Sequence, residues 1–465
     1  MAKPHVIVIP YPAQGHVIPM MELAQCLVKQ GVKVTFINTE VTHKQITSTW
    51  LDKDSFGELM VMVCIPDGLE PWEDRADFCK LNRSISKTMP SKLETLIETI
   101  NNEDEIDKIT CVIADDSFGW AIKVGHKMGI RTAAFWPASV ATLASMLSIQ
   151  KLIDDGIINH KGFPLSDQMI QLSVNMPPIK PENLLWMCFK DVDIVEAVFQ
   201  MAKEAEEAST LTERFICNSA IQLEPAAFSL YPQLLPIGPF LASNRLGDQA
   251  GHFWQEEPTC LTWLDQQPAR SVIYIAFGSF TNFDRTQFQE LAMGLELSNR
   301  PFLWVVRPGM TKETTPAYPD GYMDRVGSRG RIVSWAPQQK VLAHPSVTCF
   351  VSHCGWNSTL EGVTNGLPFL CWPYFGDQFH NETYICDIWK IGLRFDKDKT
   401  GIITRGEIKS KVKQLLGDKT FREKALDIKE KVTSSVTEGG SSHKNLSKFI
   451  QWIQEKKTDV IQGSV

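Results

Sequence analysis

Residues 335–378 of this chain, WAPQQKVLAHPSVTCFVSHCGWNSTLEGVTNGLPFLCWPYFGDQ, contain the pattern that decides the fold of its second half. Residues 347–351 are an apolar run that predicts a buried strand, and the polar residues 352–355 predict a tight turn after it. A helical pattern begins at residues 356–359, where small polar side chains suit a helix N-terminus. Because free backbone N–H groups and the helix dipole attract anions there, this order predicts a phosphate-binding site.

The same stretch carries groups that suit the other parts of a nucleotide sugar. Glu361 follows Asn357 by four residues, so both project from one face of the helix, and a carboxylate can accept from the vicinal hydroxyls of a ribose. Trp335 offers a flat apolar surface for a base, and Asp377 and Gln378 place two hydrogen-bonding side chains on a loop. Taken alone, Glu361 is more often a first-turn acid that complements the dipole, and Trp335 a core residue.

Residues 335–378 closely resemble the signature box of plant secondary-product glycosyltransferases, the UDP-sugar-dependent family-1 enzymes. The motifs WAPQ, HCGWNS and GLP, the glutamate three residues after that serine, and the final Asp-Gln all match without a gap. The resemblance extends from PYPAQGH at residues 10–16, through FGS at 277–279, to the C-terminal helix. It implies an α/β protein of the GT-B fold, with two Rossmann-like doubly wound domains facing across a cleft.

The resemblance also implies which residues bind the donor. Trp335 stacks on uracil, Gln338 and Glu361 hold the ribose, and the diphosphate lies at the helix start. A final glutamine such as Gln378 is associated with glucose, and a histidine there with galactose, so UDP-glucose is the expected co-substrate, with no metal and no other cofactor. The implied UDP-sugar-binding residues are Ser279, Trp335, Ala336, Gln338, His353, Trp356, Asn357, Ser358, Glu361, Asp377 and Gln378.

One position departs from the family pattern. Many relatives carry Thr or Ser directly after the aromatic residue that ends the strand at Trp136, and that hydroxyl touches the sugar. This chain has Pro137 there, and Ser139 two residues later, a backbone group or a water molecule could replace the missing hydroxyl. The nucleotide of the donor is therefore better specified than its sugar.

The first half of the chain supplies the expected catalytic pair. His16 ends the turn after the strand at residues 6–10, and Asp115 ends the strand at 109–115. The carboxyl ends of parallel strands share one edge of a sheet, so the two side chains can meet. A carboxylate bonded to one ring nitrogen fixes the tautomer, and the other nitrogen takes a proton from an acceptor hydroxyl. The family implies the same pair and a single inverting displacement, with Asp116 as the alternative partner.

Strand and helix patterns alternate in two halves, which predicts parallel sheets with helices on both faces. We expect an N-terminal acceptor-binding Rossmann-like domain at residues 1–240 and a linker at 241–258, where the sequence is polar and weakly periodic. A C-terminal UDP-sugar-binding Rossmann-like domain is expected at residues 259–441. By resemblance, a helix in residues 442–465 packs back on the N-terminal domain.

The acceptor site is the least specified part of the sequence. Small, mostly flat lipophilic alcohols or phenols are the implied acceptors, and the proline-broken apolar segment 177–189 is consistent with a loop over them. Aromatic residues could line the pocket, although each is individually more often part of a core. The candidates are Phe118, Trp136, Trp186, Phe189, Phe199 and Phe375.

Composition limits the partners of the protein. The 465 residues carry a net charge of −7 at pH 7, which argues against a nucleic acid as the main partner. No apolar run approaches the ~20 residues that span a bilayer. The 11 cysteines are scattered without a C-x-x-C pair, which favours free thiols in a reducing cytosol. We therefore expect a cytoplasmic monomer that binds a UDP-sugar and a small-molecule acceptor.

Other functions are compatible with parts of this pattern. A non-catalytic UDP-sugar-binding protein would keep the box of the second half without the His16–Asp115 pair, and a transferase could use another UDP-hexose. A nucleotide-dependent oxidoreductase would share the layered architecture, but no G-x-G-x-x-G follows a strand. A glucosyltransferase that acts on a small plant metabolite fits the sequence best.

Overall fold

The structure of the protein is a computed structural model with two parallel sheets, one in each of two compact units. The residues that it describes are 3–49, 57–103, 107–240, 253–311 and 318–455. The first unit comprises residues 1–166, 189–253 and 435–465, and the second comprises residues 167–188 and 254–434.

The two units do not follow the chain in a single division. Residues 167–188 lie within the range 1–240 that we expect for the first domain, but they group with the second unit. Of the expected linker at 241–258, residues 241–252 lie outside the described residues, as do residues 456–465 of the expected C-terminal segment. The described helix near the C-terminus belongs to the first unit.

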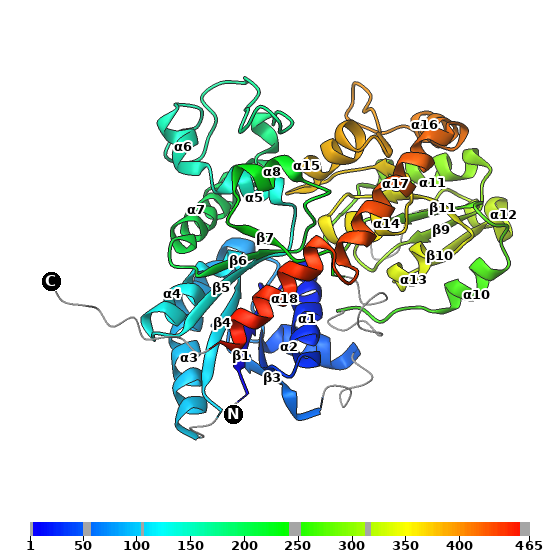
Figure 1. The fold of residues 1–465 in the computed structure, drawn as a ribbon. Helices are drawn as coiled ribbons and strands as arrows, with labels where there is room; N and C mark the ends of the chain where they lie inside the picture. The colour runs from blue at the N-terminus through cyan, green and yellow to red at the C-terminus, as the bar shows by residue number, and fades with distance from the viewer. Residues whose placement is uncertain (1–2, 50–56, 104–106, 241–252, 312–317, 456–465) are drawn as a thin grey trace. The chain divides into compact units, whose positions relative to one another are not determined.

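The first unit is built on a seven-stranded parallel sheet (Figure 1). β1 (His5–Ile9), an interior strand of this sheet, is buried along its whole length, as its run of apolar residues predicts. In sheet order the strands are β3 (Met60–Ile65), β2 (Lys33–Thr39), β1, β4 (Ile109–Asp115), β5 (Arg131–Trp136), β6 (Arg214–Cys217) and β7 (Leu234–Pro236).

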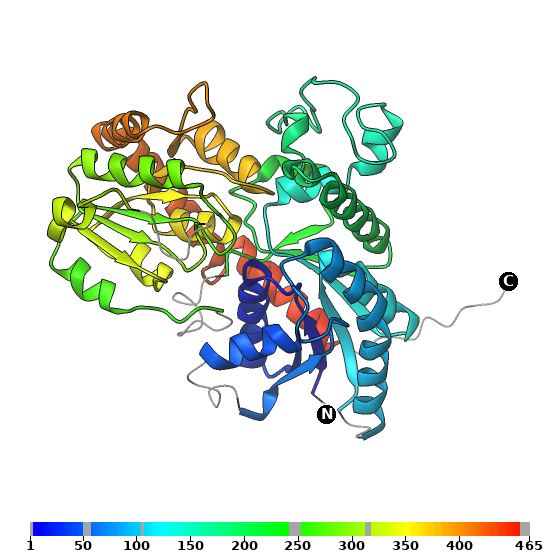
Figure 2. The ribbon, with the colours of Figure 1, turned by 180° about the vertical axis from the view of Figure 1, so that it is seen from behind.

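Helices cover both faces of this sheet. On one face, α18 (Ser441–Gln454) lies beside α1 (Gln14–Lys29), and Phe449 and Ile453 enter the same apolar core as α1 (Figures 1 and 2). The helices that pack together on the other face are α3 (Phe78–Glu103), α4 (Gly119–Lys127) and α7 (Val192–Ser209). Further described helices of this unit are α2 (Glu40–Thr49), α5 (Val140–Met146), α6 (Ile149–Asp154) and α8 (Pro225–Leu230).

The second unit is built on a six-stranded parallel sheet, with aromatic side chains such as Phe288 and Trp304 in its core. In sheet order the strands are β10 (Gly330–Val333), β9 (Phe302–Val305), β8 (Val272–Ala276), β11 (Val347–Ser352), β12 (Phe369–Cys371) and β13 (Gly392–Arg394). The described α-helices are α10 (Thr259–Asp265), α11 (Arg285–Ser298), α12 (Tyr322–Val326), α13 (Gln338–Leu342), α14 (Trp356–Thr364), α15 (Gln378–Thr383), α16 (Arg405–Gly417) and α17 (Lys419–Val436).

Each sheet has a point at which the order of its strands reverses. The first sheet starts at β1 and grows outward through β2 and β3, and the chain then returns to place β4 on the other side of β1. In the second sheet the same reversal lies between β8 and β11. Ligands of doubly wound α/β sheets bind beyond the carboxyl ends of the strands at such points. In the part of the chain that the structure describes, no helix is both long and apolar enough to cross a membrane.

Candidate functional site

His16 and Asp115 meet at the reversal point of the first sheet. His16 lies in the first turn of α1, which begins at Gln14, and not in the turn before the helix as we expected. Asp115 is the last residue of β4, and its side chain is completely buried. The Nδ1–H of His16 donates to Oδ2 of Asp115 across 2.7 Å. Because this bond makes Nδ1 the donor, the lone pair of the neutral ring lies on Nε2.

The carboxylate of Asp115 is held by a second bond. Its Oδ1 accepts from the backbone N–H of Ser117 at 3.0 Å, which fixes the orientation of the group. The neighbouring Asp116 is also buried, and its Oδ2 has no hydrogen-bond partner among the described residues. Burial and the adjacent charge of Asp115 raise the pKa of Asp116 to about 8. Asp116 is therefore neutral near pH 7, and the structure pairs His16 with Asp115.

Aromatic rings and an amide surround this pair. The ring centroid of Tyr11 lies 5.2 Å from that of His16 and 5.5 Å from that of Phe118. Nδ2–H of Asn82, in α3, donates to the hydroxyl of Tyr11 at 3.1 Å. Sequence reasoning missed Tyr11 and Asn82, because their contact joins segments 71 residues apart and leaves no local pattern.

The aromatic candidates for the acceptor pocket belong to both units. In the first unit, Phe189 stacks on Phe78 at the start of α3, with ring centroids 6.4 Å apart. The other candidates in the first unit are Phe118, Trp136 and Phe199, and those in the second unit are Trp186 and Phe375. Of the whole set, Phe118 is the one that lies against Tyr11 beside His16.

Ser139 does not replace the hydroxyl that is missing at Pro137. Its side chain is completely buried at the start of α5. Its Oγ accepts from the backbone N–H of Thr142 at 3.2 Å and lies 2.8 Å from the hydroxyl of that residue. Since the hydroxyl is engaged in capping the helix, our expectation that it could contact the sugar is wrong.

In the second unit, His353 lies between two glycines that follow strands. Gly278 follows β8 with φ +68°, and Gly355 directly precedes α14. A Cβ atom would lie 2.6 Å from Nε2 of His353 at the first glycine and 2.5 Å at the second, so neither position has room for a side chain. Burial lowers the pKa of His353 to about 4, so the ring is neutral at physiological pH. The one N–H of the neutral ring donates to the backbone carbonyl of Ala276, so His353 brings no positive charge to the turn.

The start of α14 has the form of an anion site. The turn before it contains Cys354 in the left-handed region, with φ +65°, and the N–H of Cys354 donates to Oγ of Ser352 at 3.0 Å. Gly355 brings no side-chain cap to the helix. Three of the expected diphosphate-binding residues, 356–358, form the first turn of α14, and Ser279 directly follows Gly278. A helix of nine residues that begins in this way presents backbone N–H groups to an anion.

The two residues expected at the ribose are bonded to one another. Nε2 of Gln338 donates to Oε2 of Glu361 at 2.6 Å and to Oγ of Ser358 at 2.8 Å. Oε1 of Gln338 accepts from the hydroxyl of Tyr274 at 3.0 Å, and Gln339 donates to Oε1 of Glu361 at 3.3 Å. Burial raises the pKa of Glu361 to about 7, although the bonds from both glutamines favour the ionised form. Gln339 and Tyr274 were not among the predicted residues.

Trp335 is stacked on a second tryptophan. Its ring centroid lies 5.7 Å from that of Trp254, with 24° between the planes. The backbone around Trp335 is fixed as well, because its carbonyl accepts from the N–H of Glu257 at 2.9 Å. Ala336, which follows, is buried. Trp335 is thus held in place by a residue that the signature box does not contain, 81 positions earlier in the chain.

The sequence matches a family model along most of its length. The model is described as UDP-glucoronosyl and UDP-glucosyl transferase, and it matches residues 4–431. UDP-glycosyltransferase 83A1 of Arabidopsis thaliana is 45% identical over 466 residues, which cover 98% of each chain.

This chain belongs to the plant family-1 UDP-glycosyltransferases.

Solved structures of this family share its fold. A UDP-glucosyltransferase from Polygonum tinctorium matches with a TM-score of 0.83 at 28% identity, over 98% of this chain and 99% of that chain. Os79 from O. sativa, in complex with UDP, matches with a TM-score of 0.80 at 27% identity, over 96% of this chain and 100% of that chain. The expected GT-B fold of two Rossmann-like domains is confirmed, and the protein is a glycosyltransferase enzyme.

The end of the signature box of this UDP-glycosyltransferase forms a fixed loop. Oε1 of Gln378 accepts from the backbone N–H groups of Tyr374 and Phe375, at 2.7 and 3.1 Å. Asn381, which the sequence reasoning missed, donates Nδ2–H to Asp377 at 2.8 Å and to the carbonyl of Cys354 at 2.8 Å. The loop expected to bind the sugar is therefore bonded to the turn expected to bind the diphosphate.

Proposed function

We propose that this enzyme transfers glucose from UDP-glucose to a hydroxyl of a small lipophilic plant metabolite, with inversion at the anomeric carbon. The observation that carries the proposal is the 2.7 Å bond between Nδ1 of His16 and Oδ2 of Asp115. A protein that only bound a UDP-sugar would have no use for an oriented base. The Polygonum tinctorium relative is described as capable of glucosylating indoxyl, which supports a small aromatic acceptor.

The reaction begins at the acceptor. Nε2 of His16 takes the proton of the acceptor hydroxyl while the oxygen attacks the anomeric carbon opposite the departing UDP. The carboxylate of Asp115 stabilises the imidazolium that forms, and the bond to Ser117 keeps that carboxylate in place. A positioned base of this kind contributes ~10²–10⁴-fold to a rate. Phenols, with a pKa near 10, need less of this help than aliphatic alcohols do.

The second unit holds the donor in this proposal. Trp335 stacks on the uracil, and the bonded pair of Gln338 and Glu361 receives the ribose hydroxyls. The first turn of α14 surrounds the diphosphate, where backbone N–H groups offset the charge that builds up on the β-phosphate as UDP leaves. His353 is neutral because burial lowers its pKa to about 4, and it lies beside this turn, where it adds no positive charge.

Gln378 supports glucose as the sugar. Because Oε1 is engaged by two backbone N–H groups, the amide Nε2 is the group that is left to donate to a sugar hydroxyl.

Gln378→His removes that arrangement, so we expect weaker use of UDP-glucose and a gain for UDP-galactose. An unaltered ratio of kcat/KM values for the two donors would contradict this role of Gln378.

A donor-by-acceptor assay tests the whole proposal. The protein is incubated with UDP-glucose or UDP-galactose and a panel of phenols and aliphatic alcohols, and both UDP and the product mass are measured. We expect UDP release that depends on a phenol and a product heavier by one hexose. UDP release without any acceptor would indicate hydrolysis, and donor binding without turnover would indicate a UDP-sugar-binding protein. Either result would overturn the proposal.

We also propose that the enzyme works in the cytoplasm. All 11 cysteines of the chain lie in described residues and are free thiols. Cys371 and Cys386 keep separate sulfur atoms 3.7 Å apart although they are close neighbours. Thiols persist in this state in a reducing compartment.

A further inference from the structure

We propose that Tyr11 and Asn82 form a polar subsite that binds a second oxygen atom of the acceptor, apart from the hydroxyl that receives the sugar. The inference rests on the proposed function, because it assigns the reacting hydroxyl to His16. Tyr11 lies in the loop between β1 and α1, and Asn82 lies near the start of α3. Both residues belong to the first unit.

The hydroxyl of Tyr11 is both held and able to donate. Nδ2–H of Asn82 donates to it at 3.1 Å, and the hydroxyl proton has no acceptor among the described residues. An oxygen that accepts from Asn82 directs its own proton elsewhere. Burial raises the pKa of Tyr11 to about 12, so this proton stays in place at physiological pH. Tyr11 therefore offers one oriented donor.

Asn82 offers the complementary acceptor. Its Nδ2 also donates to the carbonyl of Phe78 at 2.8 Å, so both amide hydrogens are used. The side chain is only 8% exposed, and the remaining polar atom is its carbonyl oxygen Oδ1. Together the two residues present one donor and one acceptor, which are the groups that a hydroxyl needs.

This pair lies within an otherwise aromatic wall beside the proposed base. The ring of Tyr11 contacts those of His16 and Phe118, and the ring of Phe118 lies 5.1 Å from that of Trp120. Small-molecule sites are mostly apolar, with a few polar groups that fix the orientation of the ligand. An acceptor whose reacting oxygen lies at His16 and whose rings extend along Tyr11 brings a second oxygen to the pair.

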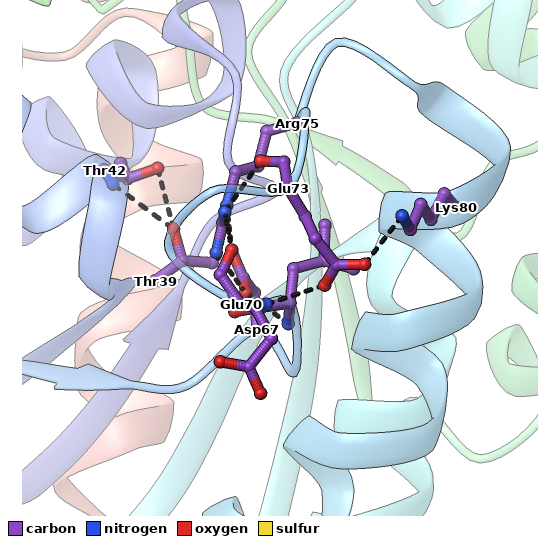
Figure 3. Close-up of polar contacts among 8 residues, drawn as sticks. Thr39, Thr42, Asp67, Glu70, Glu73, Arg75 and Lys80 are labelled. Atoms are coloured by element: carbon purple, nitrogen blue, oxygen red, sulfur yellow. Dashed lines mark hydrogen bonds and ion pairs between the residues drawn. The ribbon is translucent and has the colours of Figure 1, made fainter.

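Ion pairs join residues of the loop before α3 (Figure 3). Arg75 donates to both carboxylate oxygens of Asp67, at 3.1 Å each, so the loop is closed by a two-point ion pair. Lys80, in the first turn of α3, pairs with Glu73 of the loop at 2.6 Å. The first pair closes the loop on itself, and the second joins the loop to the first turn of α3, two residues before Asn82.

The substrate class follows from these groups. It is a flat, lipophilic phenol that carries a second oxygen on the same ring system. A second hydroxyl uses both Tyr11 and Asn82, because it accepts from one and donates to the other. A methoxy oxygen uses Tyr11 alone, because it can only accept.

Three probes separate these cases: 2-naphthol, 7-methoxy-2-naphthol and 2,7-dihydroxynaphthalene. For the wild-type enzyme we expect kcat/KM to rise in that order, with the diol ~10-fold or more above 2-naphthol once its two equivalent hydroxyls are counted. Tyr11→Phe keeps the ring on His16 but should remove both preferences, so that the kcat/KM values of the two oxygenated probes fall relative to that of 2-naphthol. Asn82→Ala should remove the preference for the diol over the methyl ether. Tyr231→Phe, which removes a hydroxyl bonded to Ser148 at 2.7 Å in the same unit, is the matched control and should change none of the ratios.

Two results would overturn the inference. An equal loss for all three probes in Tyr11→Phe would show that Tyr11 only supports His16, and unchanged ratios in both variants would show that no subsite exists. If the wild-type enzyme turns over none of the probes, their dissociation constants measured by calorimetry decide instead, and equal affinities count against the subsite. Turnover of any phenol with UDP-glucose tests the proposed function independently, because it does not depend on the order of the probes.

Discussion

The imidazole of His16 reaches Asp115 because α1 begins at Gln14, above the carboxyl end of β1 and beside β4. Removal of the ring in His16→Ala should leave UDP binding nearly unchanged, since the proposed donor residues belong to the second unit. Glucosyl transfer should fall by ~10²–10⁴-fold. Calorimetry with UDP and initial rates with a phenol measure the two effects, and Asp115→Asn is the matched variant that keeps the shape of the pair but loses its charge. Unchanged turnover in His16→Ala would remove this residue from the mechanism.

Glu361 makes UDP binding depend on pH. Burial raises its pKa from 4.5 to about 7. The ionised carboxylate can accept from both ribose hydroxyls, whereas the protonated form cannot, so UDP affinity should fall ~10-fold as the pH is lowered from 8 to 6. The terminal phosphate of UDP itself titrates near a pH of about 6, so the informative quantity is the difference from Glu361→Gln. Calorimetry that gives the same pH dependence for both proteins would contradict the role of Glu361.

For folding, the sign of the Glu361 effect is opposite. The folded state holds the proton more tightly than the unfolded chain does, because the pKa is about 7 in the fold and 4.5 in the ordinary side chain. This stabilising contribution is fully present below pH 4.5 and is lost as the pH rises to 7. At the pH at which UDP binds best, the buried carboxylate of Glu361 is ionised, and its burial lowers the stability of the ligand-free protein. Hydrogen bonds from bound UDP offset this loss of stability.

The sequence indicates which residues lie together where they belong to one contiguous motif or follow a recognisable strand. Gln338 and Glu361 could be placed together because the signature box contains both, and His16 and Asp115 because each follows a recognisable strand. Contacts between distant segments could not be predicted in this way. Trp254 stacks on Trp335 from outside the box, and no spacing in the sequence indicates that the two rings meet.

Among the elements, the loop after β8 controls the turn before α14. In Gly278→Ala the new Cβ would lie 2.6 Å from Nε2 of His353, in a backbone with φ +68°. We expect the variant to lose ~1–2 kcal/mol of stability from the backbone alone and to bind UDP at least about 10-fold more weakly, because His353 must leave its place. Gly401→Ala is the matched control, since Gly401 has φ +83° and nothing within 4 Å of the new Cβ. Equal UDP affinities in the two variants, measured by calorimetry, would show that the His353 contact is unimportant.

The lengths of the elements explain which of them the sequence missed. β7 and β13 have three residues each, which leaves little room for an apolar run or an alternation, whereas the equally short β12 lies within the apolar stretch 368–373. The start of α1 was also placed too late, because Gly15 suggests a turn when it is seen in sequence alone. Pro19 lies inside α1, beyond the first turn, and the helix continues through it to Lys29.

At the scale of the whole molecule, His16 and Asp115 lie where the strand order of the first sheet reverses, and His353 and the start of α14 lie where that of the second sheet does. Trp335 instead follows the edge strand β10. The alternation of strands and helices in the sequence predicts two such sheets, and the comparisons confirm the fold. The grouping of residues 167–188 with the second unit could not be predicted, because this segment carries no strand pattern and its place depends on contacts with distant parts of the chain. The alternation of strands and helices thus predicts the two sheets, but it does not predict where every connecting segment lies.

The return of the chain to its first unit gives a prediction about stability. Trp452 of α18 is 7% exposed, and the guanidinium groups of Arg131 and Arg214 lie 5.1 and 5.3 Å from its ring centroid. Trp452→Ala should cost ~3–5 kcal/mol, from the cavity and from the lost cation–π contacts, whereas Trp72→Ala, at a residue that is 81% exposed in the same unit, should change stability by less than about 0.5 kcal/mol. Denaturant unfolding compares the two variants, and UDP calorimetry should give the wild-type affinity for both, because the proposed donor residues lie in the second unit. If Trp452→Ala were no less stable than Trp72→Ala, α18 would add little to the core of the first unit, and the 14 residues of that helix would need another explanation for their buried face.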